Sequence, residues 1–122
     1  MGTMPKALPL LDAKAPICCA PLGGEAALTE ADANALAVRL KALADPTRLR
    51  LLSYILDQPT QEACTCDLAP LVGLTDATVS HHLKKLEGAG LVTKERRGMS
   101  VHYSVVPEAL LAIADALHLQ RC

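Results

Sequence analysis

Residues 64–88 read CTCDLAPLVGLTDATVSHHLKKLEG, and this stretch decides the fold. Its first part, Cys64 to Val72, predicts a short helix whose leucines face inward at helical spacing. Gly73 follows as a joint that permits a left-handed backbone. Thr75 then offers an N-cap to a longer helix that ends near Gly88, with an apolar stripe of Val79, Leu83 and Leu86. A short helix, a tight turn and a capped second helix predict a helix-turn-helix motif.

Two further helices precede this motif. A helix from about Glu30 to Ala44 is predicted by leucines at helical spacing, with Thr29 as its N-cap. Asp45-Pro46 ends that helix and begins the next, because Asp is a good cap and Pro suits the first helical position. The second helix then ends near Gln58-Pro59.

After Gly90 the apolar period changes from helical spacing to alternation. Residues 91–96 and 101–105 predict two strands joined through Arg97-Gly98-Met99-Ser100. A last helix is predicted from Pro107 to about Leu119, with apolar positions at Leu110, Leu111, Ala114 and Leu117. The predicted fold class is therefore mainly α with a small β-hairpin, a winged helix-turn-helix with an extra helix at each end.

Composition fits one domain of this kind. Of 122 residues 51 % are hydrophobic but only 2 % aromatic, which favours close-packed aliphatic helices over a sheet sandwich. We expect a flexible N-terminal arm over 1–28, the winged domain over 29–119 and a C-terminal tail over 120–122. The arm is rich in Pro, Gly and Ala and carries Cys18 and Cys19.

The formal net charge of −1 argues against nonspecific coating of nucleic acid, but the charge is uneven along the chain. Basic residues gather after Thr75, at Lys84, Lys85, Lys94, Arg96 and Arg97. There is no apolar run of the roughly 18 residues that would span a bilayer, and prolines interrupt the N-terminus, so we expect a cytoplasmic protein. In a reducing compartment the five cysteines are expected to be thiols or metal ligands rather than structural disulfides.

Four sequence blocks resemble the ArsR/SmtB family of metalloregulatory repressors: LADPTRLRLL at 43–52, CTCDL at 64–68, TVSHHLKKL at 78–86 and GLV at 90–92. The resemblance covers about residues 35–106, and in combination and order the blocks are specific. It implies a homodimeric repressor of a resistance operon, with the first and last helices forming the dimer interface. It also implies that binding of a metal or metalloid lowers the affinity for operator DNA.

The helix after Thr75 is the predicted DNA reader, since short polar side chains near a helix N-terminus reach base edges in the major groove. The predicted DNA contacts on it are Thr75, Asp76, Thr78, Ser80, His81, His82, Lys84 and Lys85. Thr75 is expected to act chiefly as the cap. Adjacent helical residues point about 100° apart, so the two histidines are not expected to chelate one ion together; one is expected to pack beneath the helix or bond locally while the other faces DNA. Arg96 and Arg97 at the hairpin are expected to reach the minor groove or phosphates. A two-fold dimer then implies a near-palindromic operator.

The predicted sensor is a set of four cysteines. Cys64 and Cys66 lie at a helix start, where exposed N–H groups favour thiolates, which are soft donors. In some arsenic sensors of the family a third helix cysteine follows three residues after the second, and here that position is Ala69. Further sulfur is therefore expected from Cys18 and Cys19, as the resemblance to CadC-like sensors implies. We expect As(III) or Sb(III) as the inducer, with Cd(II), Pb(II) or Zn(II) as alternatives, and Cys122 as a spectator.

Three other classes of function can be compared with this sequence. A repressor of the same fold could sense oxidants or sulfide by forming a disulfide or persulfide. A thiol oxidoreductase would need Cys-x-x-Cys on a βαβ core, which this sequence lacks, so we do not expect an enzyme. A constitutive architectural protein would leave the paired cysteines without a task.

Overall fold

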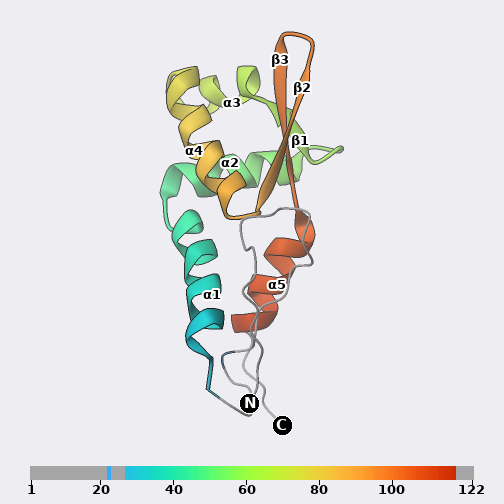
Figure 1. Ribbon diagram of the computed structural model, residues 1–122. Coiled ribbons are helices and arrows are strands. Elements are labelled where there is room, and N and C mark those ends of the chain that lie inside the picture. The colour runs from blue at the N-terminus through green and yellow to red at the C-terminus, as the bar shows by residue number, and fades with distance from the viewer. Residues whose placement is uncertain (1–21, 23–26, 118–122) are drawn as a thin grey trace.

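The computed structural model describes Leu22 and residues 27–117, and its element order is that of a winged helix-turn-helix (Figure 1). The elements are α1 (Glu30–Leu43), α2 (Pro46–Asp57), β1 (Glu62–Cys64), α3 (Thr65–Val72), α4 (Asp76–Gly88), β2 (Val92–Arg97), β3 (Ser100–Val105) and α5 (Pro107–Leu117). The predicted arm lies outside the described residues except at positions 22, 27 and 28, and so do Cys18, Cys19 and the predicted tail.

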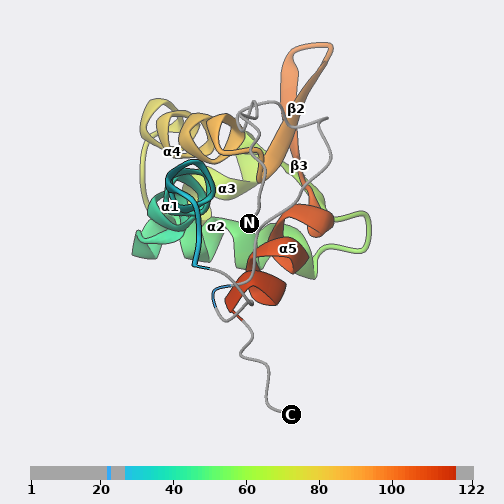
Figure 2. The same cartoon turned by 60° about the horizontal axis from the view of Figure 1, so that its bottom comes forward.

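The core lies where α2, α3 and α4 meet one face of the sheet. Its largest fully buried side chains come from three helices and the start of β2, and are Leu51, Ile55, Leu68, Val79, Leu83, Leu86, Leu91 and Val92. The helical members recur every three or four residues, so each helix turns one apolar stripe toward the others. Figure 2 shows α2 crossing the body behind α1 and α5.

The predicted caps are confirmed. The side chain of Thr29 accepts the backbone N–H of Asp32 at 3.0 Å, and Asp45 accepts that of Arg48 at 3.1 Å. Gly73 ends α3 with a φ of 69°, the left-handed conformation that an L side chain rarely adopts. These local signals set where α1 and α2 begin and form the turn between α3 and α4.

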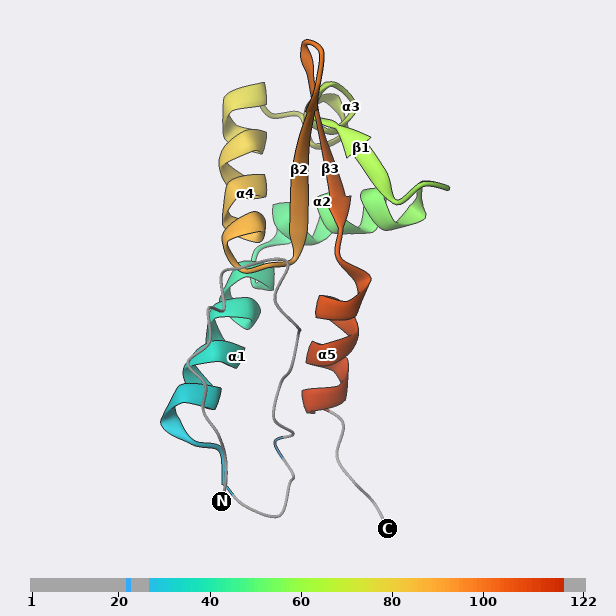
Figure 3. The ribbon, with the colours of Figure 1, turned by 45° about the vertical axis from the view of Figure 1, so that its right-hand side comes forward.

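The sheet has three antiparallel strands in the order β1-β3-β2, one more than predicted (Figure 3). β1 is the addition: it pairs Cys64 with His102, and it delays the start of α3 to Thr65. Residues directly opposite each other share a face, so Ala63, Tyr103 and Lys94 lie on the core face. The hairpin continues past the core to a tip at Gly98.

α1 and α5 extend from the body on the side opposite the hairpin tip (Figures 1 and 3). On α5 the buried residues are Ala109, Ile113 and Ala116. The predicted apolar stripe of this helix is largely exposed instead, with Leu111 at 64 % and Leu117 at 44 %. The helix is apolar on two sides, and only one of them is covered by the described residues. No helix among the described residues is long and apolar enough to cross a membrane.

Candidate DNA interface and thiol site

α4 packs one face into the core and leaves the opposite face exposed to a partner. With Val79, Leu83 and Leu86 packed inward, the predicted contacts left exposed are Thr75, Asp76, Thr78, His81, Lys84 and Lys85, and Ser80 is partly buried. The N-terminal end of α4 lies at the same end of the molecule as the hairpin tip (Figures 1 and 3). Two segments predicted to contact DNA are therefore presented together.

Thr75 has a local role. Its hydroxyl accepts the backbone N–H of Thr78 at 3.2 Å and lies 3.0 Å from the Thr78 hydroxyl. It is thus the N-cap of α4, as expected from the sequence.

His82 differs from the other polar residues of α4 because it turns toward α2. Its Nδ1 lies 3.1 Å from a terminal nitrogen of Arg48 and 3.9 Å from the carboxylate of Asp45. The neighbouring His81 is exposed. Of the two adjacent histidines, one turns inward to residues of a distant helix and the other faces solvent, so His82 does not belong to the exposed face of α4.

The two arginines of the hairpin have different surroundings. Arg97 holds Glu62 of β1 through both carboxylate oxygens, at 2.9 and 3.1 Å, and also lies 2.9 Å from Glu95. The Glu95 and Glu62 carboxylates that accept its hydrogen bonds raise the pKa of the Arg97 guanidinium. Arg96 lies on the other face of the hairpin, opposite Val101, and makes no ion pair with the described part of the chain.

Lys94 is a basic residue of the hairpin that was not among the predicted DNA contacts. It lies two residues before Arg96, so both side chains emerge on the face of the hairpin that packs on the helices. Both are exposed. The period of two in the predicted strand was the signal that could have added Lys94 to these contacts.

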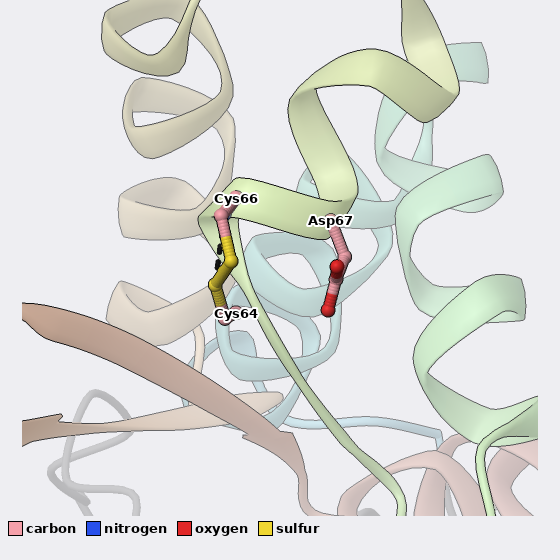
Figure 4. A group of neighbouring side chains, drawn as sticks. All are labelled: Cys64, Cys66 and Asp67. Atoms are coloured by element: carbon pink, nitrogen blue, oxygen red, sulfur yellow. Dashed lines mark hydrogen bonds between the residues drawn. A yellow bond between two sulfur atoms is a disulfide. The ribbon is translucent and has the colours of Figure 1, made fainter.

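Cys64 connects the sheet to the helix-turn-helix. It is the last residue of β1 and the N-cap of α3, where its sulfur accepts the backbone N–H of Cys66 at 3.0 Å (Figure 4). Cys64 is 5 % exposed, whereas Cys66 is exposed. An extended Cys64 followed by the first helical turn brings the two sulfur atoms to the same side.

The structure differs here from the prediction of two free thiols, because Cys64 and Cys66 are joined by a disulfide across a Cα–Cα distance of 5.2 Å. The physical reason is proximity: the cap geometry leaves the two sulfurs within bonding reach. Asp67 joins them in a group whose ligand atoms all lie within 4.8 Å of one another (Figure 4). This carboxylate was not among the predicted ligands, although it directly follows Cys66.

A helix-turn-helix with an exposed polar face, beside a hairpin with free basic residues, defines a DNA-binding regulator of the winged-helix class. A family model described as "Bacterial regulatory protein, arsR family" matches residues 45–94. A putative arsenical resistance operon repressor of Halobacterium salinarum is 36 % identical over 103 residues, 82 % of each chain. This chain belongs to the arsR family of bacterial regulatory proteins.

A further relative and two solved structures are also similar to this chain. A transcriptional repressor SmtB homolog of Synechocystis is 39 % identical over 92 residues, 72 % of this chain but 66 % of that protein. The chain therefore spans slightly less than two thirds of that relative. The crystal structure of AntR, an antimony-specific transcriptional repressor, has a TM-score of 0.64 at 33 % identity and covers 76 % of this chain and 83 % of its own. A homodimeric winged helix-turn-helix domain from Mycobacterium bovis has a TM-score of 0.60 at 26 % identity, over 73 % of this chain and 83 % of that one.

Proposed function

We propose that this protein is a homodimeric repressor that binds a near-palindromic operator and releases it when cysteine thiolates bind As(III) or Sb(III). The proposal of DNA binding rests on one observation: the N-terminal end of α4, with its polar face, and the hairpin tip lie at the same end of the molecule (Figure 3). Thr78, His81 and Lys85 recur at helical spacing on that face and would enter the major groove. Arg96 and Lys94 would contact the adjacent backbone or minor groove.

A second copy is the proposed partner of α1 and α5. The side of α5 that the described residues leave uncovered presents Leu111 and Leu117, and a mostly apolar groove of about 890 Å³ is lined by residues of α1, α2 and α5. Leu43 of α1, Leu49 of α2 and Leu110 of α5 line that groove. Exposed apolar surface of this kind is characteristic of a protein interface. A two-fold dimer would repeat α4 about one helical turn of DNA away.

The sensor half rests on the chemistry of the donor set. Cys64 and Cys66 supply two adjacent sulfurs, and trivalent arsenic bound through sulfur takes three thiolates. Ala69 occupies the position of a third helix cysteine, so Cys18 and Cys19 would complete the site. A disulfide has no thiolate to donate, so ion binding requires the reduced pair.

The proposed site lies on the element that supports the reader helix. α3 carries Cys66 and packs against α4 through Leu68, which is fully buried. Drawing Cys64 and Cys66 toward sulfurs of the arm would shift α3 and hence the presentation of α4. Couplings of about 1–3 kcal/mol are typical between two such sites, equivalent to roughly 5–150-fold weaker operator binding.

The test is an operator-release titration. Duplexes are selected from a random-sequence library by the reduced wild-type protein, and As(III) is then titrated into the complex. Release by wild type and retention by the Cys64→Ser/Cys66→Ser variant is the expected result. Equal release by both proteins would show that these two thiols do not bind the inducer. Failure of the wild type to select any sequence would refute the proposal that the protein binds an operator.

Sensing of an oxidant is a second candidate function, favoured by the Cys64–Cys66 disulfide. With a peroxide as oxidant, the two thiols lose two protons and two electrons as the S–S bond forms, and hydrogen peroxide is reduced to two water molecules. Operator release by peroxide in the absence of As(III), reversed by a dithiol, would support this function.

A Cd(II), Pb(II) or Zn(II) sensor is the third candidate, favoured by the carboxylate of Asp67 beside the sulfurs. Asp67→Asn would then weaken the response to those ions but not to As(III).

A further inference from the structure

One arginine joins three helices near the middle of α4. Arg48 lies in the first turn of α2, and its Nε donates to the carbonyl of Ala42 in α1 at 2.7 Å. A terminal nitrogen of the same guanidinium lies 3.1 Å from Nδ1 of His82 on α4. The side chain therefore spans from the end of α1 to the predicted reader helix.

The chemistry of this contact fixes the direction of the hydrogen bond. A guanidinium carries only donors and stays protonated, so Nδ1 of His82 must be the acceptor and the ring proton must be on Nε2. Asp45, 3.9 Å from the same Nδ1, accepts the backbone N–H of Arg48 and keeps its negative charge near the guanidinium. The contact thus depends on an acceptor at one particular ring position.

A second arginine contacts the C-terminal end of α4. Arg39 of α1 is 4 % exposed, and its Nε donates to the carbonyl of Ala89, the C-cap of α4, at 3.4 Å. α4 is consequently held at its middle by Arg48 and at its end by Arg39. Two separated contacts restrict the tilt of a helix, which one contact alone does not.

We propose that Arg48 is a positioning residue for DNA recognition: its hydrogen bond to His82 fixes the tilt of α4 relative to α1. This inference rests on the proposed role of α4 as the DNA reader. Because α1 belongs to the proposed dimer interface, the tilt of each α4 from its own α1 determines how the two reader helices of a dimer match one operator. His82 takes part from within the protein rather than by contacting a base.

The test compares two amide variants at position 82. The side-chain oxygen of Asn occupies roughly the place of Nδ1, whereas that of Gln reaches the place of Nε2. We expect His82→Asn to bind the selected duplex within about threefold of wild type, and His82→Gln to bind it roughly tenfold more weakly, about 1.4 kcal/mol. Affinity for a random duplex should stay unchanged in both, since phosphate contacts carry it.

Arg48→Ala has a matched control in Arg50→Ala, which removes the same charge from the same helix. Arg50 donates its hydrogen bond to the carbonyl of Leu71 on α3 rather than to a residue of α4. Arg48→Ala should lose about as much specific affinity as His82→Gln, and the double variant should lose no more than either alone. Arg50→Ala should keep wild-type affinity.

Three outcomes would overturn the inference. Equal affinity of the Asn and Gln variants would show that the acceptor position is irrelevant, and additive losses in the double variant would show that Arg48 and His82 act separately. Equal losses in Arg48→Ala and Arg50→Ala would assign the effect to charge. If the wild type selects no duplex, the proposed function itself fails, which is a separate result from these three.

Discussion

The sulfur of Cys64 accepts the backbone N–H of Cys66 at 3.0 Å, so the first residue of the proposed sensor pair is also the cap of α3. The two roles have different chemical requirements. A hydroxyl can replace sulfur as a helix cap, but it is a poor donor to a soft ion. Substitutions at one position can therefore separate folding from sensing.

Cys64→Ser should keep α3 capped and abolish release by As(III), whereas Cys64→Ala should lose both functions. We expect the Ala variant to be less stable than the Ser variant by about 1 kcal/mol, the usual value of an N-cap. Urea unfolding under reducing conditions measures the difference, and the operator-release titration measures sensing. Equal stability of the two variants would contradict the capping role, and normal release by Cys64→Ser would contradict the ligand role.

Asp45 should make the stability of α2 depend on pH in acid. The backbone N–H of Arg48 donates to this carboxylate and lowers its pKa below the ordinary 3.8, while partial burial opposes the shift. A lowered folded-state pKa means that the stabilisation is present above the ordinary value and is lost as the pH falls through the lowered one. Thermal unfolding from about pH 5 to about pH 2 should therefore show a steeper loss for wild type than for Asp45→Asn, whose amide oxygen caps without titrating. Parallel curves for the two proteins would refute this.

Lys84 and Lys85 should contribute through phosphate contacts. Each substitution to Ala should reduce the slope of log affinity against log salt by about one, with similar effects on selected and random duplexes. Lys41→Ala is the control, because Lys41 is exposed in the last turn of α1 and belongs neither to α4 nor to the hairpin. An unchanged slope in the double variant would place these lysines outside the DNA contact.

Arg96→Ala should weaken operator binding more than Arg97→Ala. Arg97 already holds Glu62 and Glu95, and DNA would have to compete with both carboxylates for its guanidinium. Arg96 carries no such ion pair to the described residues. Fluorescence anisotropy with one labelled duplex measures both variants, and a larger loss in Arg97→Ala would reverse the assignment of the DNA-facing side of the hairpin.

Leu111→Glu should convert the proposed dimer to a monomer without unfolding it. The side chain is 64 % exposed in one chain, so the charge costs little in the monomer but would be buried in the dimer. Light scattering gives the mass, and operator affinity should fall because one domain reads only half of the site. Met99→Glu, at a hairpin-tip residue that is 95 % exposed, should leave the mass unchanged. A Leu111→Glu variant that stays dimeric would exclude this side of α5 from the interface.

Local sequence signals were sufficient to predict most of the fold. The caps Thr29, Asp45 and Thr75, the left-handed Gly73 and the apolar stripe of α4 are all determined within a few residues, and each is confirmed. β1 was missed because three residues carry no detectable period. Its pairing with β3 joins Cys64 to His102, 38 residues along the chain.

The parts of the site that sequence could not predict depend on contacts between distant segments. His82 and Arg48 are separated by 34 residues, and Arg97 and Glu62 by 35. Nothing in the spacing of His81 and His82 says which of them turns inward, since that depends on where α2 begins. The alternation of the hairpin does place Arg96 and Arg97 on opposite faces, but only the presence of β1 explains why Arg97 is the one held in ion pairs.

The position of Cys64 between β1 and α3 gives the protein two structural connections from a single residue, one hydrogen-bonded and one covalent. Through β1 its backbone is hydrogen-bonded to β3, one leg of the wing, and through Thr65 it continues directly into the helix that abuts α4. A displacement at this junction would therefore act on both α4 and the hairpin, the two parts proposed to contact DNA. An inducer bound at this junction would not need to contact the nucleic acid in order to weaken the proposed DNA contacts of α4 and of the hairpin together.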